Sequence, residues 1–329
     1  MTKPEPDSLQ CMNGGAASEP AKRMHCSLCL SERRCNLRKR REVDRKGLQR
    51  VTVCLDKARI PMDRRERVRL YDQVAEQYDR TRPVYPDEVI DEILGSFAGD
   101  LSVLDVGCGT GIAARQMQNR GASVLGVDMS PGMSKIAAQY GITTEVVPFE
   151  TWESEGRTFD RVTSGQAWHW MDAVDCAMRA DAVLKPGGRL CLFWNLGFHA
   201  DDLADALAAA YRRALPPDSP KLTIGYAVSR STALPSDLSA PADFGVVTGS
   251  PHAFRHMTEE PFRAFPWQQD YTRDEWLDEL CSHTDHVALD ARVRQNLFDE
   301  IGNTIDDFGG SFTMNFITYL VCATASGKR

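Results

Sequence analysis

The chain has 329 residues, of which 42% are hydrophobic and 26% are charged, and it carries a formal net charge of −7. This composition is typical of a water-soluble globular protein, and the length allows two domains or one α/β domain with insertions. No apolar run approaches the length of a membrane span, and the N-terminus lacks the apolar segment of a signal peptide, so we expect a cytoplasmic protein. We therefore expect the 10 cysteines to be reduced thiols.

The N-terminal part differs in charge from the rest of the chain. Residues 1–62 carry 14 Lys and Arg against 7 Asp and Glu, whereas the remainder has a net charge of −14. Because residues 1–61 show no sustained hydrophobic period, they are expected to be a disordered basic extension. Two other hypotheses stay open for it. The basic run at 33–41 could contact nucleic acid, and a zinc site could use Cys26, Cys29 and Cys35 with His25 or Cys54.

The most informative stretch is a short apolar strand that runs into a glycine-rich turn and then a helix, over residues 102–117. Glycines at alternate positions from 107 to 111 allow positive φ and let a ligand approach the backbone. The helix that follows adds unpaired N–H groups. A dinucleotide site would need the spacing Gly-x-Gly-x-x-Gly, but Ile112 stands in place of its third glycine. Asp105, just before the loop, would repel a pyrophosphate and could receive an ammonium group, so a pyrophosphate is disfavoured.

The run from Val103 to Gly111 resembles the first motif of class I S-adenosylmethionine (SAM) dependent methyltransferases. The resemblance implies an α/β fold, namely a Rossmann-like, seven-stranded, mainly parallel sheet with helices on both faces and a final antiparallel strand. It implies that residues 62–329 form one SAM-dependent methyltransferase domain, with about 196–260 as a cap or insert over the substrate site. Within the motif it implies the following cofactor-binding residues: Asp105, Gly107, Cys108, Gly109, Thr110 and Gly111.

A second buried strand at 122–127 ends in an acidic residue, Asp128. A carboxylate at this place can accept hydrogen bonds from both hydroxyls of a ribose, so it supports a nucleoside cofactor without choosing between SAM and a dinucleotide. The resemblance makes Asp128 the ribose ligand and puts Met129 against the adenine. It also puts Glu150 near the adenine amino group. The family more often has the pair Asp-Ala or Glu-Ala at this place, so the alternative is that Glu150 is simply exposed to solvent.

The segment before the motif combines a helical pattern over 64–78 with the sequence Tyr-Asp-Arg-Thr-Arg-Pro-Val-Tyr-Pro at 78–86. It is similar to a passage that closes over the methionine end of the cofactor in the family. An aromatic face attracts a sulfonium and a guanidinium pairs with a carboxylate, so Tyr78 and Arg82 are the candidate ligands of that end. The alternative places Tyr78 in the core and Arg82 in solvent.

A fourth strand within 158–170 must end at the same crevice as the glycine loop, because ligands of open parallel sheets bind beyond the carboxyl ends of the strands. Nucleic-acid amino-methylating relatives carry Asn/Asp-Pro-Pro-Tyr/Phe there, whereas this chain resembles small-molecule enzymes of the trans-aconitate methyltransferase type. We expect Gln166 to contact the cofactor and Trp168 and Trp170 to contact the substrate. The alternative for the two tryptophans is ordinary packing in the core. His169 is the catalytic candidate: a general base, a group that orients the substrate, or a structural histidine.

The rest of the chain predicts further alternating elements. In chain order these are a helix at 173–184, a tight turn at 185–188, a strand at 189–195, a helix at 201–215, a strand at 262–267, a helix capped by Thr272 and Glu275, a helix at 290–305 and an antiparallel strand at 311–321.

The sequence as a whole predicts methyl transfer from SAM by in-line attack of a small-molecule carboxylate, hydroxyl or amine on the sulfonium methyl, with no metal required. Two other classes of function stay open. A nucleic-acid methyltransferase would use the basic extension, although the acidic remainder of the chain argues against it. A SAM-binding module without catalysis would keep the loop and lack the acceptor pocket.

Overall fold

A computed structural model of the chain describes residues 63–96, 100–216 and 254–326. The predictions for residues 1–61, which include the zinc hypothesis and the basic run, lie outside these residues, as does most of the insert expected at 196–260. In the described part of the chain, no helix has both the length and the apolar character needed to cross a membrane.

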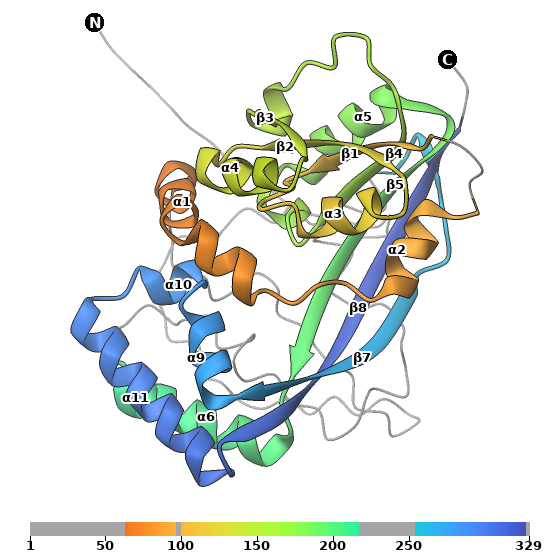
Figure 1. The fold of residues 1–329 in the computed structure, drawn as a ribbon. Coiled ribbons are helices and arrows are strands. Elements are labelled where there is room, and N and C mark those ends of the chain that lie inside the picture. The colour runs from red at the N-terminus through yellow and green to blue at the C-terminus, as the bar shows by residue number, and fades with distance from the viewer. Residues whose placement is uncertain (1–62, 97–99, 217–253, 327–329) are drawn as a thin grey trace, which may run out of the picture. The chain divides into compact units, whose positions relative to one another are not determined.

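The described strands form one eight-stranded sheet in the order β3-β2-β1-β4-β5-β8-β6, with β7 also paired to β8. Strands β1 to β5 pair in parallel, and β8 runs antiparallel to β5, β6 and β7. The predicted mainly parallel sheet with a final antiparallel strand is thus confirmed (Figure 1). The bounds are β1 Ser102–Val106, β2 Ser123–Asp128, β3 Thr143–Val146, β4 Phe159–Gly165, β5 Leu184–Phe198, β6 Met257–Glu259, β7 Arg263–Thr272 and β8 Ser311–Ala325.

The strand count differs from the predicted seven because one position in the sheet is divided. β6 pairs with residues 323–325 of β8, and β7 pairs with residues 311–320 along the rest of that strand. Seven strand positions therefore hold eight strands.

The helices follow the predicted positions closely. Their bounds are α1 Arg64–Thr81, α2 Asp87–Leu94, α3 Ile112–Gln118, α4 Pro131–Gln139, α5 Ala173–Val183, α6 Asp201–Ala214, α9 Arg273–Leu280, α10 Thr284–Val287 and α11 Ala291–Asp307, with short 3₁₀ turns η1 Phe149–Thr151 and η2 Trp168–Trp170. The predicted cap of α9 is confirmed: Thr272 and Glu275 form a reciprocal capping box. The short helix α10 was not predicted, because its four residues are too few to show a period.

Alternating strand residues build a core on each face of the sheet. Leu104 and Leu192 pack with α5 on one face, whereas Val103 and Phe193 pack with α2 and α3 on the other. Both faces of the parallel strands are therefore covered by helices, as predicted.

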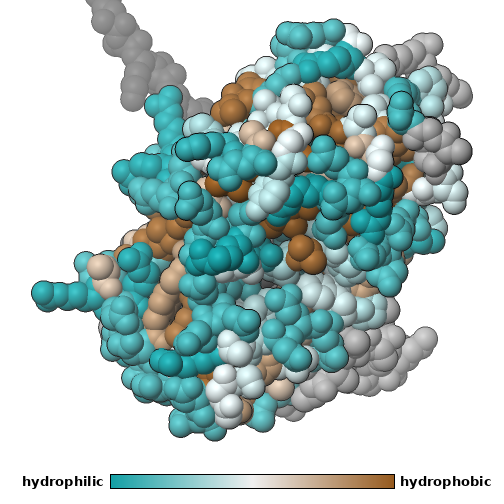
Figure 2. All heavy atoms as spheres, in the orientation of Figure 1, coloured by the Kyte–Doolittle hydropathy of each residue, from teal (hydrophilic) through white to brown (hydrophobic). Residues whose placement is uncertain are grey.

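Strands β5 and β8 are each 15 residues long and continue past the short parallel strands (Figure 1). Helices α6, α9 and α11 pack at this extended end, in a third core that includes Leu207, Trp276, Ile301 and Phe316. Figure 2 shows mainly hydrophilic side chains on the viewed face, as expected when the apolar sides of the helices face these cores. The extension places a second group of helices beyond the carboxyl ends of the parallel strands, where ligands of such sheets bind.

The tight turn predicted at 185–188 is instead an irregularity inside β5. Leu184 pairs with Phe159 and Arg189 pairs with Arg161, so the four intervening residues face one residue of β4. The segment therefore bulges out of the strand without ending it.

Candidate active site

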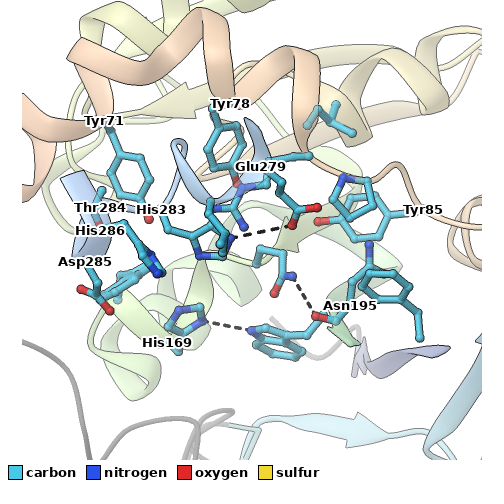
Figure 3. A pocket seen from close by; sticks show the side chains of 18 of the residues that line it. Tyr71, Tyr78, Tyr85, His169, Asn195, Glu279, His283, Thr284, Asp285 and His286 are labelled. Atoms are coloured by element: carbon cyan, nitrogen blue, oxygen red, sulfur yellow. Dashed lines mark hydrogen bonds and ion pairs between the residues drawn. The ribbon is translucent and has the colours of Figure 1, made fainter. Parts of the chain in front are cut away.

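Two cavities adjoin at the carboxyl ends of the parallel strands. The loop cavity is lined by Gly107, Gly109, Asp128, Met129 and Phe149, among others. The cap cavity is lined by side chains from α1, η2, β5, α9 and α10 and from the segments before α2 and α10. Figure 3 shows Tyr85, His169, Glu279 and His283 among them. Both cavities share four lining residues: Tyr71, Tyr78, Gln166 and Trp170.

The glycines of the loop have different surroundings. Gly109 has a φ of +56°, and no described atom lies within 4 Å of a Cβ built on it, so its backbone faces the open loop cavity. A Cβ on Gly107 would lie 2.4 Å from Cβ of Ala167, across the cavity floor. Gly111 lets α3 approach Ala137 of α4. Gly107 and Gly109 line the cavity, whereas Cys108, Thr110 and Gly111 do not.

Asp128 lies on the wall of the loop cavity, as its predicted role requires. Its Oδ2 accepts the Gly109 N–H at 2.9 Å and its Oδ1 accepts the Ser130 N–H at 2.8 Å. Burial raises the pKa of this carboxyl, and the two backbone donors act in the opposite direction. Asp128 therefore joins the end of β2 to the glycine loop and holds both in place.

Asp105 does not line either cavity, in contrast to the expectation of direct contact with the cofactor. Its side chain is 1% exposed and accepts a hydrogen bond from Oγ1 of Thr163 at 2.8 Å. Burial raises its pKa to about 7. Strand alternation places Asp105 on the same face of β1 as Val103, the face that α2 and α3 cover, so its side chain is buried there.

Met129 and Phe149 both line the loop cavity, where the adenine end is expected, whereas Glu150 does not. The Glu150 carboxylate pairs with Arg64 of α1 at 2.8 Å. Arg64 Nε also lies 3.1 Å from Sδ of Met129. Glu150 thus fastens the start of α1 beside the cavity, and its predicted contact with an adenine amino group remains a prediction.

Tyr78 and Arg82 lie together at the end of α1. Tyr78 lines both cavities, and Arg82 lines the cap cavity. The Arg82 guanidinium carbon is 4.8 Å from the centre of the Tyr78 ring, and Nε donates to Ser282 Oγ at 2.9 Å. The guanidinium is therefore held at the entrance of the cap cavity by α9 and its following turn.

Gln166 follows β4 directly and separates the two cavities. Its φ of +57° is unusual for a residue with a side chain, and such backbone strain costs ~1–3 kcal/mol and is concentrated at functional sites. Its backbone N–H donates to Phe193 O at 2.9 Å, and its side-chain Nε2 donates to Asn195 O at 3.0 Å. These bonds to β5 hold Gln166 in this conformation.

The two tryptophans of η2 point in different directions. Trp170 lines both cavities, and Arg67 lies 3.9 Å over its ring. Trp168 is fully buried in the core beneath α5 and lines neither cavity. The assignment of Trp168 to the substrate is therefore not supported, because the 3₁₀ turn directs its side chain into the core.

His169 lines the cap cavity, and its Nδ1 accepts a hydrogen bond from Trp194 Nε1 at 3.1 Å (Figure 3). An indole N–H can only donate, so Nδ1 must carry a lone pair, and the neutral ring then has its proton on Nε2. His169 in this tautomer offers a donor at Nε2. Among the three hypotheses for His169, this geometry favours orientation of the substrate by a hydrogen bond over a general base.

Sequence reasoning missed Glu279 and His283, which line the cap cavity from α9 and the residue before α10. Glu279 is 2% exposed and lies on the same helix face as the buried Trp276 and Leu280. An acidic residue on the apolar face of an amphipathic helix was the signal that could have revealed it.

Comparison with known proteins matches residues 104–192 to the family model described as a methyltransferase domain. The chain is 38% identical over 126 residues to an uncharacterized methyltransferase of Mycobacterium tuberculosis, covering 36% of this chain and 49% of that protein. It is 36% identical over 110 residues to the ubiquinone biosynthesis O-methyltransferase of Acinetobacter baylyi, covering 31% and 46%. The chain thus spans about half the length of the curated relatives it matches.

Among solved structures, a protein of Anaeromyxobacter dehalogenans assigned provisionally as a type II methyltransferase superposes with a TM-score of 0.51 at 18% identity. The match covers 74% of this chain and 97% of that one. At this identity the likeness shows a common fold.

Proposed function

We propose that the protein transfers the methyl group of SAM to a small-molecule acceptor bound in the cap cavity. The match of residues 104–192 to a methyltransferase domain supports this proposal. One observation carries this proposal. The loop cavity and the cap cavity share Tyr71, Tyr78, Gln166 and Trp170 as lining residues, so ligands in the two cavities would both contact these side chains.

The residues of the loop cavity fit the proposed cofactor. The cavity opens to solvent, and its lining combines apolar side chains with polar groups, as in small-molecule sites. Gly109 leaves its wall free of side chain, Asp128 offers carboxylate oxygens for a ribose, and Met129 with Phe149 offers apolar surface for a base. The SAM assignment of these residues is part of the proposal.

Bound SAM supplies a methyl group that is already activated by its sulfonium. The chain's own contribution is therefore to bind, to align and to exclude water. Holding two reactants in register can contribute ~7 kcal/mol or more to lowering a barrier. The rings of Tyr78 and Trp170 on the shared wall would attract a positive charge. Nε2 of His169 would orient the acceptor with a hydrogen bond.

The cap cavity supports a small acceptor. Its wall includes aromatic rings from four different elements, namely Tyr71 of α1, Trp170 of η2, Trp194 of β5 and Trp276 of α9. These rings stand beside polar groups such as His169 and Glu279, so the lining is suited to a compact organic molecule that carries a polar group. The basic run that a nucleic-acid substrate would use lies outside the described residues.

Calorimetry and mass spectrometry test the proposal. The full chain should bind SAM and S-adenosylhomocysteine saturably, and incubation with SAM and a panel of carboxylic acids, phenols and amines should give products heavier by one methylene. Asp128→Asn should weaken binding of both nucleosides, whereas Asp100→Asn, an exposed change before β1, should bind as the unchanged chain does. Absence of saturable SAM binding would refute the function.

A further inference from the structure

Glu279 is an acidic side chain that the fold keeps away from solvent and next to a cavity. It is 2% exposed, and it lines the cap cavity with the rings described above. Placing a carboxyl in such surroundings disfavours its charged form and raises its pKa. A group of this kind at a cavity wall is a candidate for proton transfer.

The groups that face Glu279 come from several elements. Nε2 of His283 lies 3.8 Å from Oε1 of Glu279, as the dashed line in Figure 3 marks. Arg82, Tyr271 and His199 each act to lower the pKa of Glu279, but burial has the larger effect. Burial and the charge of Arg82 hold the pKa of His283 well below its usual value, so the imidazole beside Glu279 stays neutral at ordinary pH.

We propose that Glu279 is the proton acceptor of the transfer, and that the acceptor molecule therefore carries a hydroxyl or an amine. This inference rests on the proposed function. A lone pair on the oxygen or nitrogen of the acceptor forms the bond to the methyl carbon, and the electron pair of the breaking C–S bond stays on sulfur. The proton displaced from that oxygen or nitrogen goes to the ionised carboxylate of Glu279.

The surroundings favour this chemistry over methylation of a carboxylate. A carboxylate acceptor has no proton to lose, so it would leave Glu279 without a role in the transfer. Its charge would be attracted by Arg82 and opposed by Glu279 and Asp285 on the same cavity wall. His169 is less suited to take a proton, because its Nδ1 already accepts the Trp194 N–H. Glu279 is thus the described group in this cavity whose position and basicity both suit the step.

A structural role is the competing explanation, in which Glu279 serves only to balance the charge of Arg82. The two roles differ in what Glu279→Gln does. Removing one partner of a buried charge pair destabilises a fold strongly, so a structural role predicts a clear loss of thermal stability. A catalytic role predicts a stable variant with altered proton chemistry.

The first experiment measures proton release by calorimetry and needs no known acceptor. SAM carries a positively charged sulfonium, which lowers the pKa of a nearby carboxyl, whereas S-adenosylhomocysteine does not. Binding of SAM should therefore release more protons from Glu279 than binding of S-adenosylhomocysteine. Titrations of the full chain in two buffers of different ionisation enthalpy, repeated from pH 5.5 to 8.5, give the number released. We expect the difference between the two nucleosides to vanish in Glu279→Gln. It should persist in Asp278→Asn, a control on the same helix whose carboxylate pairs with exposed Arg80 at 2.9 Å.

The second experiment follows turnover with phenols and amines. Glu279→Gln should lower kcat by ~10²–10⁴-fold, the usual size of general-base effects, with little change in KM, and should remove the fall in rate toward low pH. An unchanged difference in proton release, wild-type turnover by the variant, or products from carboxylic acids alone would overturn the inference. A chain that fails to bind SAM would instead overturn the proposed function.

Discussion

Asp105 makes the stability of the protein depend on pH in a direction opposite to that of most carboxylates. Its pKa is raised from 3.8 to about 7 in the folded chain, chiefly by burial. The folded state therefore holds a proton that the unfolded chain releases, so this stability is fully present below pH 3.8 and is lost as pH rises through about 7. Replacing Asp105 by Asn keeps an oxygen for the Thr163 hydroxyl and removes the titration.

The size of the effect follows from the shift. Lowering the pH from 8 to 5 should raise the free energy of unfolding by about 2–3 kcal/mol through Asp105 alone, since each pKa unit corresponds to about 1 kcal/mol or slightly more. Other groups titrate in this range as well, so the informative quantity is the difference between the wild type and Asp105→Asn. That difference should change by about 2–3 kcal/mol between the two pH values.

Urea denaturation at pH 5, 6, 7 and 8 measures this difference, with Asp100→Asn as the exposed control for the same chemical change. The control should follow the wild type at every pH. Parallel curves for wild type and Asp105→Asn would refute the reasoning, since they would mean that Asp105 has the same pKa in both states.

Two further predictions concern the walls of the loop cavity. Gly107 and Gly109 both have positive φ, which costs an alanine ~1–2 kcal/mol. Gly107→Ala adds overlap with Ala167 and should lower the free energy of unfolding by ~2–4 kcal/mol, whereas Gly109→Ala should lose only the first part and should also weaken SAM binding. Denaturation and calorimetry separate these losses, and a larger loss of stability for Gly109→Ala would contradict the argument. Arg64→Gln should lower stability by at most ~1 kcal/mol, since Arg64 is 44% exposed in its pair with Glu150. It should speed SAM dissociation in stopped-flow measurements, and an unchanged rate would show that this pair does not hold α1 over the cavity.

Much of the fold could be predicted because its signals are local. The buried strands, the glycine loop and the helix caps each depend on residues close together in the chain, and tertiary packing kept them in place. The exceptions have physical causes. The turn at 185–188 could not be distinguished from a bulge without the register of β4, and α10 is too short for a period.

The candidate site could be predicted in part, on the side where its residues follow strand ends. Gly109, Asp128 and Met129 reach the loop cavity because the carboxyl ends of parallel strands meet at one edge. The residue types in the sequence did not show which of the other predicted site residues would line the same cavity. Asp105 and Trp168 turn into the core for reasons of strand alternation and turn geometry.

The sequence by itself determined the parallel strands and the glycine loop, since these depend on short-range patterns. Only the tertiary structure decided which side chains line the cap cavity beside that loop. Glu279 lies 110 residues beyond His169, and it reaches the same cavity because the long strands β5 and β8 carry the second group of helices past the ends of the parallel strands. No local pattern encodes a contact of that range, because it arises from the packing of elements and not from their formation.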